Sequence, residues 1–417
     1  MAKRSTQKTQ VLLLYVTTLI GVVLGVVSSI INTRFVDPLV YGDVRYVQNI
    51  LNFTASLLLL GYFTSGSRLL AVARTAEDVA RVKGCMVIVL LITVAVQLVV
   101  CVACGFFNIE KDNVSYLFWI SLPVCVCPLF LNYVNTTAQG DNQIGRLAAA
   151  RLLPAFIYVP MAYFVYSRFG ADATKMILLQ WGISAIVIGG VIVSTRPRFD
   201  NLRDTWRKLR IENKTYGNQL YIGSLVMVAT NYIAGISLGV FNENNIEVGF
   251  YTLALTITGP LATLPAIIGT VYFKKFADQP RIPANVMKAT ALLTITSCIV
   301  FVVIVKPFVA FLYTDTYERV GTYATILSIG FSMHGFGDMI NRYLGSHGCG
   351  KSIRNASIAN GVFKVVGFTL FVYLFNIYGA LLTMVFCSGI YLAILLYYYR
   401  RFISKNLRGD GSSEYFL

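Results

Sequence analysis

Long, almost uninterrupted apolar runs recur along this chain, and they restrict the kind of fold open to it. A helix crosses the hydrocarbon core of a bilayer in about 20 mostly apolar residues. About twelve such runs lie at 11–33, 40–63, 84–107, 115–137, 147–168, 174–195, 217–241, 247–273, 288–312, 321–345, 355–375 and 378–400. Only 13% of the residues are charged, whereas soluble domains carry about 25%. The sequence therefore predicts an all-α integral membrane protein, with the first run retained as a helix.

The basic residues are distributed very unevenly between the segments that join these runs. If the N-terminus is cytoplasmic and the runs alternate in direction, 27 of the 35 Lys and Arg lie on the cytoplasmic side and six on the outer side. Positive charge is enriched in cytoplasmic loops of membrane proteins. The pattern predicts a multi-pass protein with both termini cytoplasmic. The net charge of +16 is then a topology signal, so we expect membrane lipids as partners and no nucleic acid.

The chain divides into two halves that resemble each other. A basic segment near 196–215, which includes "RPRFDNLRDTWRKLRIENK", separates two sets of six runs. Residues 40–71 and 247–277 both place Gly after a loop, then one apolar span, then a basic exit. An even number of runs per half makes the repeat parallel. We therefore predict two pseudo-symmetric six-helix bundles, 1–200 and 201–417, around a central cavity, as in alternating-access transporters.

The loops and the reactive residues favour a transporter over an enzyme. The predicted outer loops are short, and no Walker A sequence is present. The chain has only two His, and Cys101-x-x-Cys104 lies in an apolar run without nearby His or carboxylate, so we interpret these cysteines as buried small hydrophobes. We predict no metal and no cofactor, and we leave coupling to a proton or sodium gradient open.

Three cations lie within or at the ends of apolar runs, where an ionisable residue is a functional hypothesis by default. Lys364 lies near the middle of its run, Arg45 one to two turns into the second, and Arg34 at the end of the first. A buried ion pair for Lys364, and headgroup contacts for both arginines, remain alternatives. In the repeat, Arg45 falls on Thr252 and Arg34 on Phe241. Cations without a counterpart favour a cationic lumen that contacts an anionic ligand.

The tenth run carries His334, Asp338 and Arg342 at intervals of four residues, which places them on one helix face. His titrates near neutral pH, so His334 and Asp338 are candidates for ion coupling. The alternative is a structural polar ladder within the bundle. Separately, three proline pairs interrupt apolar runs and predict bends there. They are Pro123 and Pro128, Pro154 and Pro160, and Pro260 and Pro265.

Several segments together resemble one transporter family. They are the twelve runs in two halves, "DPLVYGDVRYVQNILNF" at the start of the second run, the basic "SRLLAVAR", and the aromatic ends "YFVYSRFGA" and "FVYLFNIYGA". The chain resembles the polysaccharide flippases of the multidrug/oligosaccharidyl-lipid/polysaccharide exporter superfamily, specifically the translocases of O-antigen or capsule repeat units. The likeness covers nearly the whole chain, although its motifs are loose and the spacer from Asp37 to Gly42 is longer than the family pattern.

The resemblance implies a function and its partners. An undecaprenyl-diphosphate-linked oligosaccharide would move from the inner to the outer leaflet of the bacterial cytoplasmic (inner) membrane, for O-antigen, lipopolysaccharide, capsule or exopolysaccharide synthesis. By position, Arg34, Arg45 and Lys364 are the substrate-binding candidates. A polysaccharide polymerase and a chain-length regulator would be protein partners, and we expect a monomer. A drug/cation antiporter of the same superfamily, a membrane enzyme of polysaccharide assembly, and a peptidoglycan-precursor flippase remain alternatives.

Overall fold

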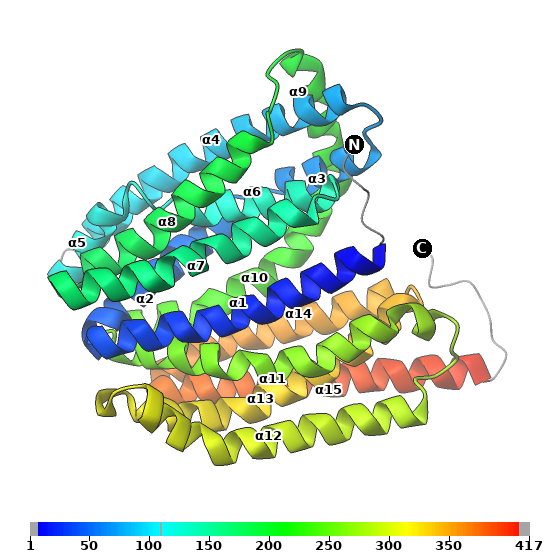
Figure 1. The fold of residues 1–417 in the computed structure, drawn as a ribbon. Coiled ribbons are helices and arrows are strands. Elements are labelled where there is room, and N and C mark those ends of the chain that lie inside the picture. Colours follow the sequence, from blue (N-terminus) through cyan, green and yellow to red (C-terminus); the bar gives the residue numbers. More distant parts are fainter. Residues whose placement is uncertain (1–6, 109–110, 408–417) are drawn as a thin grey trace. The chain divides into compact units, whose positions relative to one another are not determined.

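The computed structural model describes residues 7–108 and 111–407, and within them every regular element is a helix (Figure 1). The first ten elements are α1 (Gln7–Phe35), α2 (Pro38–Leu57), α3 (Tyr62–Val72), α4 (Ala76–Phe107), α5 (Asp112–Ser121), α6 (Cys127–Gly140), α7 (Ile144–Phe169), α8 (Ala173–Ser194), α9 (Leu202–Glu212) and the π-helix η1 (Asn213–Gly217). The others are α10 (Asn218–Phe241), α11 (Ile246–Ala277), α12 (Ala284–Leu312), the 3₁₀-helix η2 (Asp315–Tyr317), α13 (Arg319–Ser346), α14 (Gly350–Val366), the π-helix η3 (Gly367–Phe371) and α15 (Val372–Leu407). The predicted all-α membrane fold is confirmed.

The helices account for the predicted spans. By length and composition, seven described helical stretches can cross a membrane, and an eighth is formed if the bent pair α2 and α3 counts as one span. By these criteria the residues from Gly350 to Ser404 count as a single membrane-spanning stretch. However, Asn376 within this stretch has non-helical backbone angles and kinks the chain. Splitting it there, and adding α5 with α6, α10 and α13, reproduces the twelve predicted spans.

Two spans of the first half are broken. The α2 and α3 helices meet at 58°, across a turn in which Leu60 and Gly61 both have positive φ. A Cβ on Gly61 would lie 2.6 Å from the backbone of Gly217, so only glycine fits this turn. The second break lies between α5 and α6 and contains Pro123, with Pro128 in the first turn of α6. The other two proline pairs lie inside the continuous helices α7 and α11.

The chain forms two compact units, Met1–Tyr232 and Ile233–Leu417, with the division inside α10. The predicted bundles 1–200 and 201–417 stay a prediction. In the first unit, α1 packs on α7, α3 on α6, and α4 on α5. A core of large buried side chains, including Phe63, Met86 and Tyr133, lies between α3, α4 and α6. Because this core is closely packed, it holds α3, α4 and α6 in fixed positions relative to one another.

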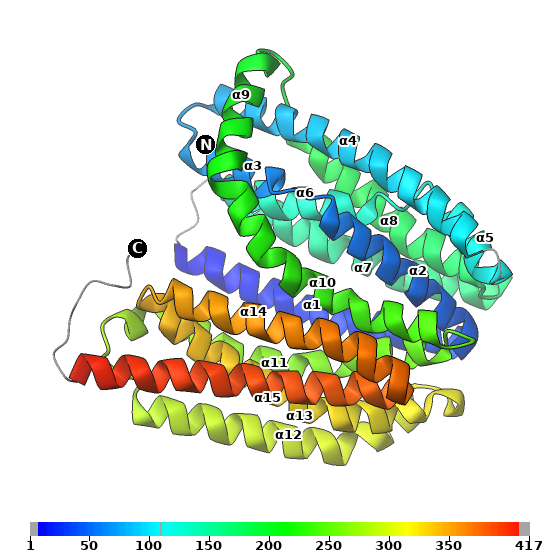
Figure 2. The same cartoon turned by 180° about the vertical axis from the view of Figure 1, so that it is seen from behind.

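In the second unit, α13 packs against α11, α12, α14 and α15 (Figure 2). A Cβ on Gly335 would lie 2.4 Å from the carbonyl oxygen of Ala262. Small residues at helix contacts allow backbones to approach closely in membranes, where packing drives association. Because α13 is surrounded by other helices, polar side chains near its middle, including His334 and Asp338, are at least partly covered by protein.

The outer faces of the helices are strongly apolar. Val303 and Phe311 on α12 are 70% and 80% exposed, and only 11% of the most apolar α12 segment is buried within the protein. So many exposed large apolar side chains on one helix are typical of a surface that faces lipid. Polar side chains that could bind a ligand are therefore concentrated in the interior of each unit.

Candidate functional sites in the two units

Arg45 is positioned by a well-defined helix start. Asp37 is the N-cap of α2, and its carboxylate accepts a hydrogen bond from the Leu39 backbone N–H at 2.9 Å. Pro38 occupies the first helical turn, where backbone N–H groups have no acceptor within the helix, so the lack of an N–H costs no hydrogen bond. Asp37 therefore acts as a helix cap that fixes where α2 begins. Arg45 follows about two turns into the helix.

The Arg45 guanidinium is held in place but is not neutralised. One of its Nη atoms donates to the Gln48 side-chain oxygen at 2.7 Å, and the group lies 4.8 Å from the centre of the Tyr41 ring. Gln48 donates in turn to Gln180 on α8 at 3.1 Å. The Arg45 Nε–H is buried and has no hydrogen-bond partner, and within residues 7–108 and 111–407 no carboxylate forms an ion pair with Arg45. A partly buried cation with a buried, unused Nε–H donor is suited to an anion.

A tyrosine and asparagine cluster lies beside Arg45. Tyr158 on α7 donates to the Asn32 side-chain oxygen of α1 at 2.5 Å, and its oxygen lies 3.2 Å from that of Tyr166. Arg45 interacts electrostatically with both tyrosines. The Asn32 amide nitrogen is buried without a partner. The sequence did not single out these neutral residues, because nothing local distinguishes them from other interior polar side chains.

Arg34 differs from Arg45 in its surroundings. It lies in the last turn of α1, where a cation is favourable for the helix dipole, and its side chain is exposed within the described structure. Both arginines belong to the first unit, and Arg45 contacts Gln48 and Tyr41 on its own helix. Arg34 therefore stays a prediction that rests on position in the sequence.

The second unit contains its own polar cluster on α13 and α15. The Tyr391 hydroxyl donates to the Asp338 carboxylate at 3.1 Å, and the Asn341 amide donates to the Tyr391 oxygen at 2.9 Å. The His334 ring stacks on Tyr391 with centroids 4.8 Å apart, and its Nδ1 is buried without a partner. His334 and Asp338 thus share Tyr391 as a common neighbour. Arg342 is exposed, and no Asp338–Arg342 ion pair is found among the described residues.

Lys364 completes this cluster from α14. Its side chain is 8% exposed, and it interacts electrostatically with Asp338, His334 and Cys387. In the part of the chain that the structure describes, the ammonium group has no ion pair or hydrogen bond. The structure thus brings together Lys364, His334 and Asp338, which the sequence had assigned to two separate roles.

A third polar group is structural. Lys83 on α4 forms an ion pair with Asp141, and the two side chains are 4% and 18% exposed. Gln143 donates to the same carboxylate at 2.6 Å, and Tyr133 donates to the Lys83 carbonyl at 3.2 Å. With the carboxylate and the ammonium both satisfied, the pair holds the α6–α7 turn against α4 and offers no free group to a ligand.

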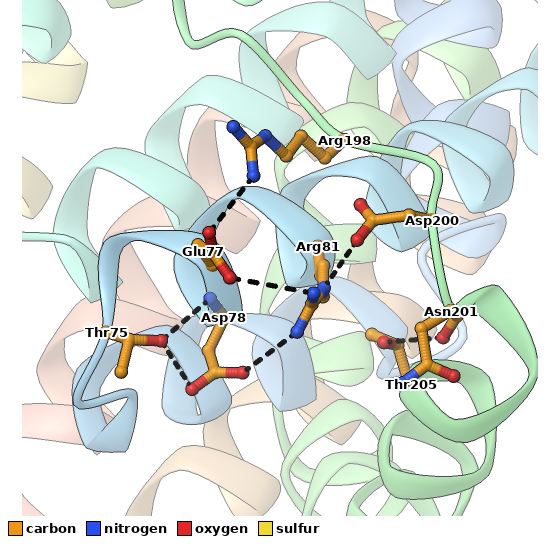
Figure 3. Close-up of polar contacts among 8 residues, drawn as sticks. All are labelled: Thr75, Glu77, Asp78, Arg81, Arg198, Asp200, Asn201 and Thr205. Atoms are coloured by element: carbon orange, nitrogen blue, oxygen red, sulfur yellow. Dashed lines mark hydrogen bonds and ion pairs between the residues drawn. The ribbon is translucent and has the colours of Figure 1, made fainter.

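The basic segment after α8 is held to the start of α4 by an ionic network (Figure 3). Arg81 donates to Asp200 at 2.8 Å and also contacts Glu77 and Asp78, while Arg198 lies 3.5 Å from Glu77. The Arg81 guanidinium holds the pKa of Asp200 below its usual value, through a side-chain hydrogen bond. The carboxylates and Arg198 are largely exposed, and Arg81 is partly exposed, so the network orients the segment more than it stabilises the fold.

Metal chemistry has no support in the described residues. All eight cysteines are free, and among residues 7–108 and 111–407 no group of three or more His, Cys, Asp or Glu is placed to hold a metal ion. The prediction that the cysteines act as small buried side chains agrees with their positions, since six of the eight are buried.

Comparison with known proteins gives the family. The family model described as "Polysaccharide biosynthesis protein" matches residues 8–277, well over half of the chain. The chain belongs to this family. The match covers the whole of α2 and α7, so the Arg45 cluster lies within the segment that defines family membership. No curated protein sequence matches the chain.

Several solved transporter structures share the fold of this polysaccharide biosynthesis protein. A structure described as the lipid II flippase MurJ in an inward closed conformation superposes with a TM-score of 0.73 at 13% identity, covering 94% of this chain and 89% of that one. An inward-facing multidrug resistance MATE family transporter of the MOP superfamily gives 0.70 at 16% identity, covering 97% and 100%. A MOP superfamily transporter from Pyrococcus furiosus, described as having a binding pocket of reverse polarity, gives 0.57 at 13% identity, covering 96% and 97%. The predicted resemblance to a family of polysaccharide biosynthesis is thus confirmed by the family model, and the solved structures confirm the fold.

Proposed function

We propose that this polysaccharide biosynthesis protein is a transporter that moves a diphosphate-linked oligosaccharide lipid from the inner to the outer leaflet of a bacterial cytoplasmic membrane. The observation that carries the proposal is Arg45, a cation inside an apolar unit with no acidic partner among the described residues and a buried, unused Nε–H donor. Partial burial of the Arg45 charge without a counter-charge is unfavourable. A ligand phosphate that accepts from Nε and Nη offsets this cost through paired, charge-assisted hydrogen bonds.

The same observation separates the proposal from its main competitor. A drug/cation antiporter has to attract positive charge, and a carboxylate in the position of Arg45 would serve that purpose. Here the interior charge beside Tyr158 and Tyr166 is positive. Neutral donors near the cation, including the unpartnered Asn32 amide nitrogen, add hydrogen bonds to an anionic oxygen without altering the net charge.

The cluster of the second unit supplies the energy coupling in this proposal. Lys364 is buried and interacts electrostatically with the partly buried His334 and Asp338, so a change of charge on one of the three groups alters the electrostatic energy of the other two. Binding or release of one proton would therefore redistribute charge across α13 and α14. We propose that this change is linked to the transport cycle, with both termini of the chain in the cytoplasm.

A reconstituted flipping assay tests the proposal. Purified protein is inserted into liposomes that contain a fluorescent polyprenyl-diphosphate oligosaccharide, and a membrane-impermeant quencher reports lipid that has reached the outer leaflet. We expect faster exchange of the diphosphate lipid than of the matching monophosphate lipid, and no effect of a cationic dye. Equal rates for both lipids, or competition by the dye, would contradict recognition of the diphosphate. A peptidoglycan precursor lipid as a second substrate separates the two kinds of flippase.

A further inference from the structure

A polar cavity of about 480 Å³ lies at one end of the second unit. Small-molecule sites typically enclose about 300–1,000 Å³, so the volume is adequate for a ligand of a few rings. The cavity is separate from the cluster of His334, Asp338 and Lys364, none of which lines it. Its lining residues are Glu247, Arg319, Thr322, Tyr323, Asn376, Ile377 and Tyr378.

Three helix ends build this cavity. Glu247 lies in the first turn of α11 and Arg319 begins α13. Asn376 lies at the kink near the start of α15, with φ 53° and ψ −134°. Such angles are rare for a residue with a Cβ, and strain of this kind concentrates at functional sites. The Asn376 and Asn242 side-chain amides bond to each other, with a distance of 3.0 Å from the Asn242 nitrogen to the Asn376 oxygen, and this pair holds the kink.

The polar groups of the cavity are balanced in charge. Arg319 and Glu247 approach to 3.6 Å, with side chains that are 73% and 17% exposed. The second carboxylate oxygen of Glu247 is buried and forms no hydrogen bond of normal geometry, and the Tyr323 side chain interacts with the same carboxylate. A nearly neutral site with one open acceptor and an exposed guanidinium is poorly suited to a phosphate, which needs excess positive charge. It is well suited to hydroxyl groups, which donate to the carboxylate and accept from the guanidinium.

Two tyrosines supply an apolar surface next to these groups. The Tyr323 and Tyr378 rings lie edge to face, with centroids 6.2 Å apart. Tyr323 is buried, whereas Tyr378 is 54% exposed, so the Tyr378 ring is available at the mouth of the cavity. Tyrosine combines a flat apolar body with a polar tip. A pyranose ring presents the matching features, a face of C–H bonds and a rim of hydroxyls.

We infer that this cavity binds a neutral saccharide, and, resting on the proposed function, that its ligand is the sugar part of the transported lipid. The cavity lies at the end of the second unit that carries the α10–α11 and α12–α13 connections. This is the end where α15 begins, opposite to its last residue Leu407. With both termini cytoplasmic, this end faces the outer side of the membrane. The sugar would occupy the cavity after it has crossed, which favours outward release of the headgroup over its return.

Saturation-transfer NMR on the full chain tests the inference. The protein is placed in phosphatidylcholine nanodiscs, because glycoside detergents would occupy a sugar site. The probes are N-acetylglucosamine, galactose, rhamnose and inorganic pyrophosphate. We expect saturation transfer to at least one sugar, with binding about tenfold weaker in Glu247→Gln, which loses a charge-assisted hydrogen bond, and in Tyr378→Ala. Tyr378→Phe keeps the ring and should retain binding.

Tyr373→Ala is the matched control, since Tyr373 is an exposed tyrosine on the same helix that contacts Phe241 and does not line the cavity. Sugar signals that persist unchanged in both Glu247→Gln and Tyr378→Ala, or that are lost equally in Tyr373→Ala, would overturn the inference. So would displacement of the sugar by pyrophosphate, which would identify an anion site.

The flipping assay keeps this inference distinct from the proposed function. If the wild type flips the diphosphate lipid but shows no sugar binding, the proposed function stands and the cavity assignment is wrong. If sugar binding depends on Tyr378 but the diphosphate lipid is not moved, the saccharide site is supported while the transport proposal fails.

Discussion

Replacing Arg45 by lysine tests the central contact of the proposed mechanism. The change keeps the positive charge but removes the planar fork, so Nη no longer bonds to Gln48 at 2.7 Å and the spare Nε–H donor disappears. One hydrogen bond to a charged group is worth about 1.5–3 kcal/mol. The apparent affinity for the diphosphate lipid should therefore fall about 10- to 150-fold. The maximal flipping rate should fall less, because a cation remains in the site.

Arg45→Ala extends the same argument. It removes the charge and also leaves the buried Gln48 oxygen without its donor, which lowers the free energy of unfolding by about 1–3 kcal/mol. Flipping of the diphosphate lipid should then be lost, and unfolding should be measured in parallel to separate the two effects. Arg68→Lys is the matched control, because Arg68 is 52% exposed and pairs with Glu212 outside the cluster.

The assay measures flipping rate against the mole fraction of diphosphate lipid in proteoliposomes with equal protein content. If Arg45→Ala flips with wild-type affinity, Arg45 is an anchor at the membrane surface and the reasoning about its unpaired donor is refuted. If Arg68→Lys is as defective as Arg45→Lys, the loss reflects a general effect of arginine replacement on the unit.

Three further predictions concern the other polar groups. Lys364→Ala should reduce surface polysaccharide in cells at normal protein level, and wild-type amounts of polymer would remove Lys364 from the mechanism. Asp338→Asn cannot release a proton, so gradient-driven flipping in vesicles should lose its dependence on the pH gradient, while a retained dependence would rule out coupling through this carboxylate. Asp141→Ala leaves Lys83 buried without its partner and should lower the free energy of unfolding by about 3–5 kcal/mol in a denaturant titration. The exposed Asp200→Ala should have little effect, and equal losses in the two variants would contradict the argument from burial.

The features that depend on local sequence, namely the positions of the spans and the break at proline, were predictable. Twelve spans follow from apolar run length, and the gap between the runs ending at residue 375 and starting at 378 matches the kink at Asn376. The break around Pro123 was signalled by proline, whose ring removes a helix hydrogen bond. The break at Gly61 was not predicted, because its positive φ is required by the close approach of Gly217, a residue more than 150 positions away in the sequence.

A charged residue in an apolar run is recognisable from the sequence as a functional candidate, but its neighbours in the folded protein are not. The sequence alone determined that this is an all-α membrane protein and which few cations lie within the spans, while the cytoplasmic placement of its basic loops stays a prediction. Only the tertiary structure decided that Arg45 has Gln48 and Tyr41 but no acidic partner among the described residues, and that Lys364 joins His334 and Asp338. The reason is physical. Hydropathy and charge are local quantities, whereas hydrogen bonds between buried groups, such as Gln48 with Gln180, depend on packing between helices that are distant in the sequence.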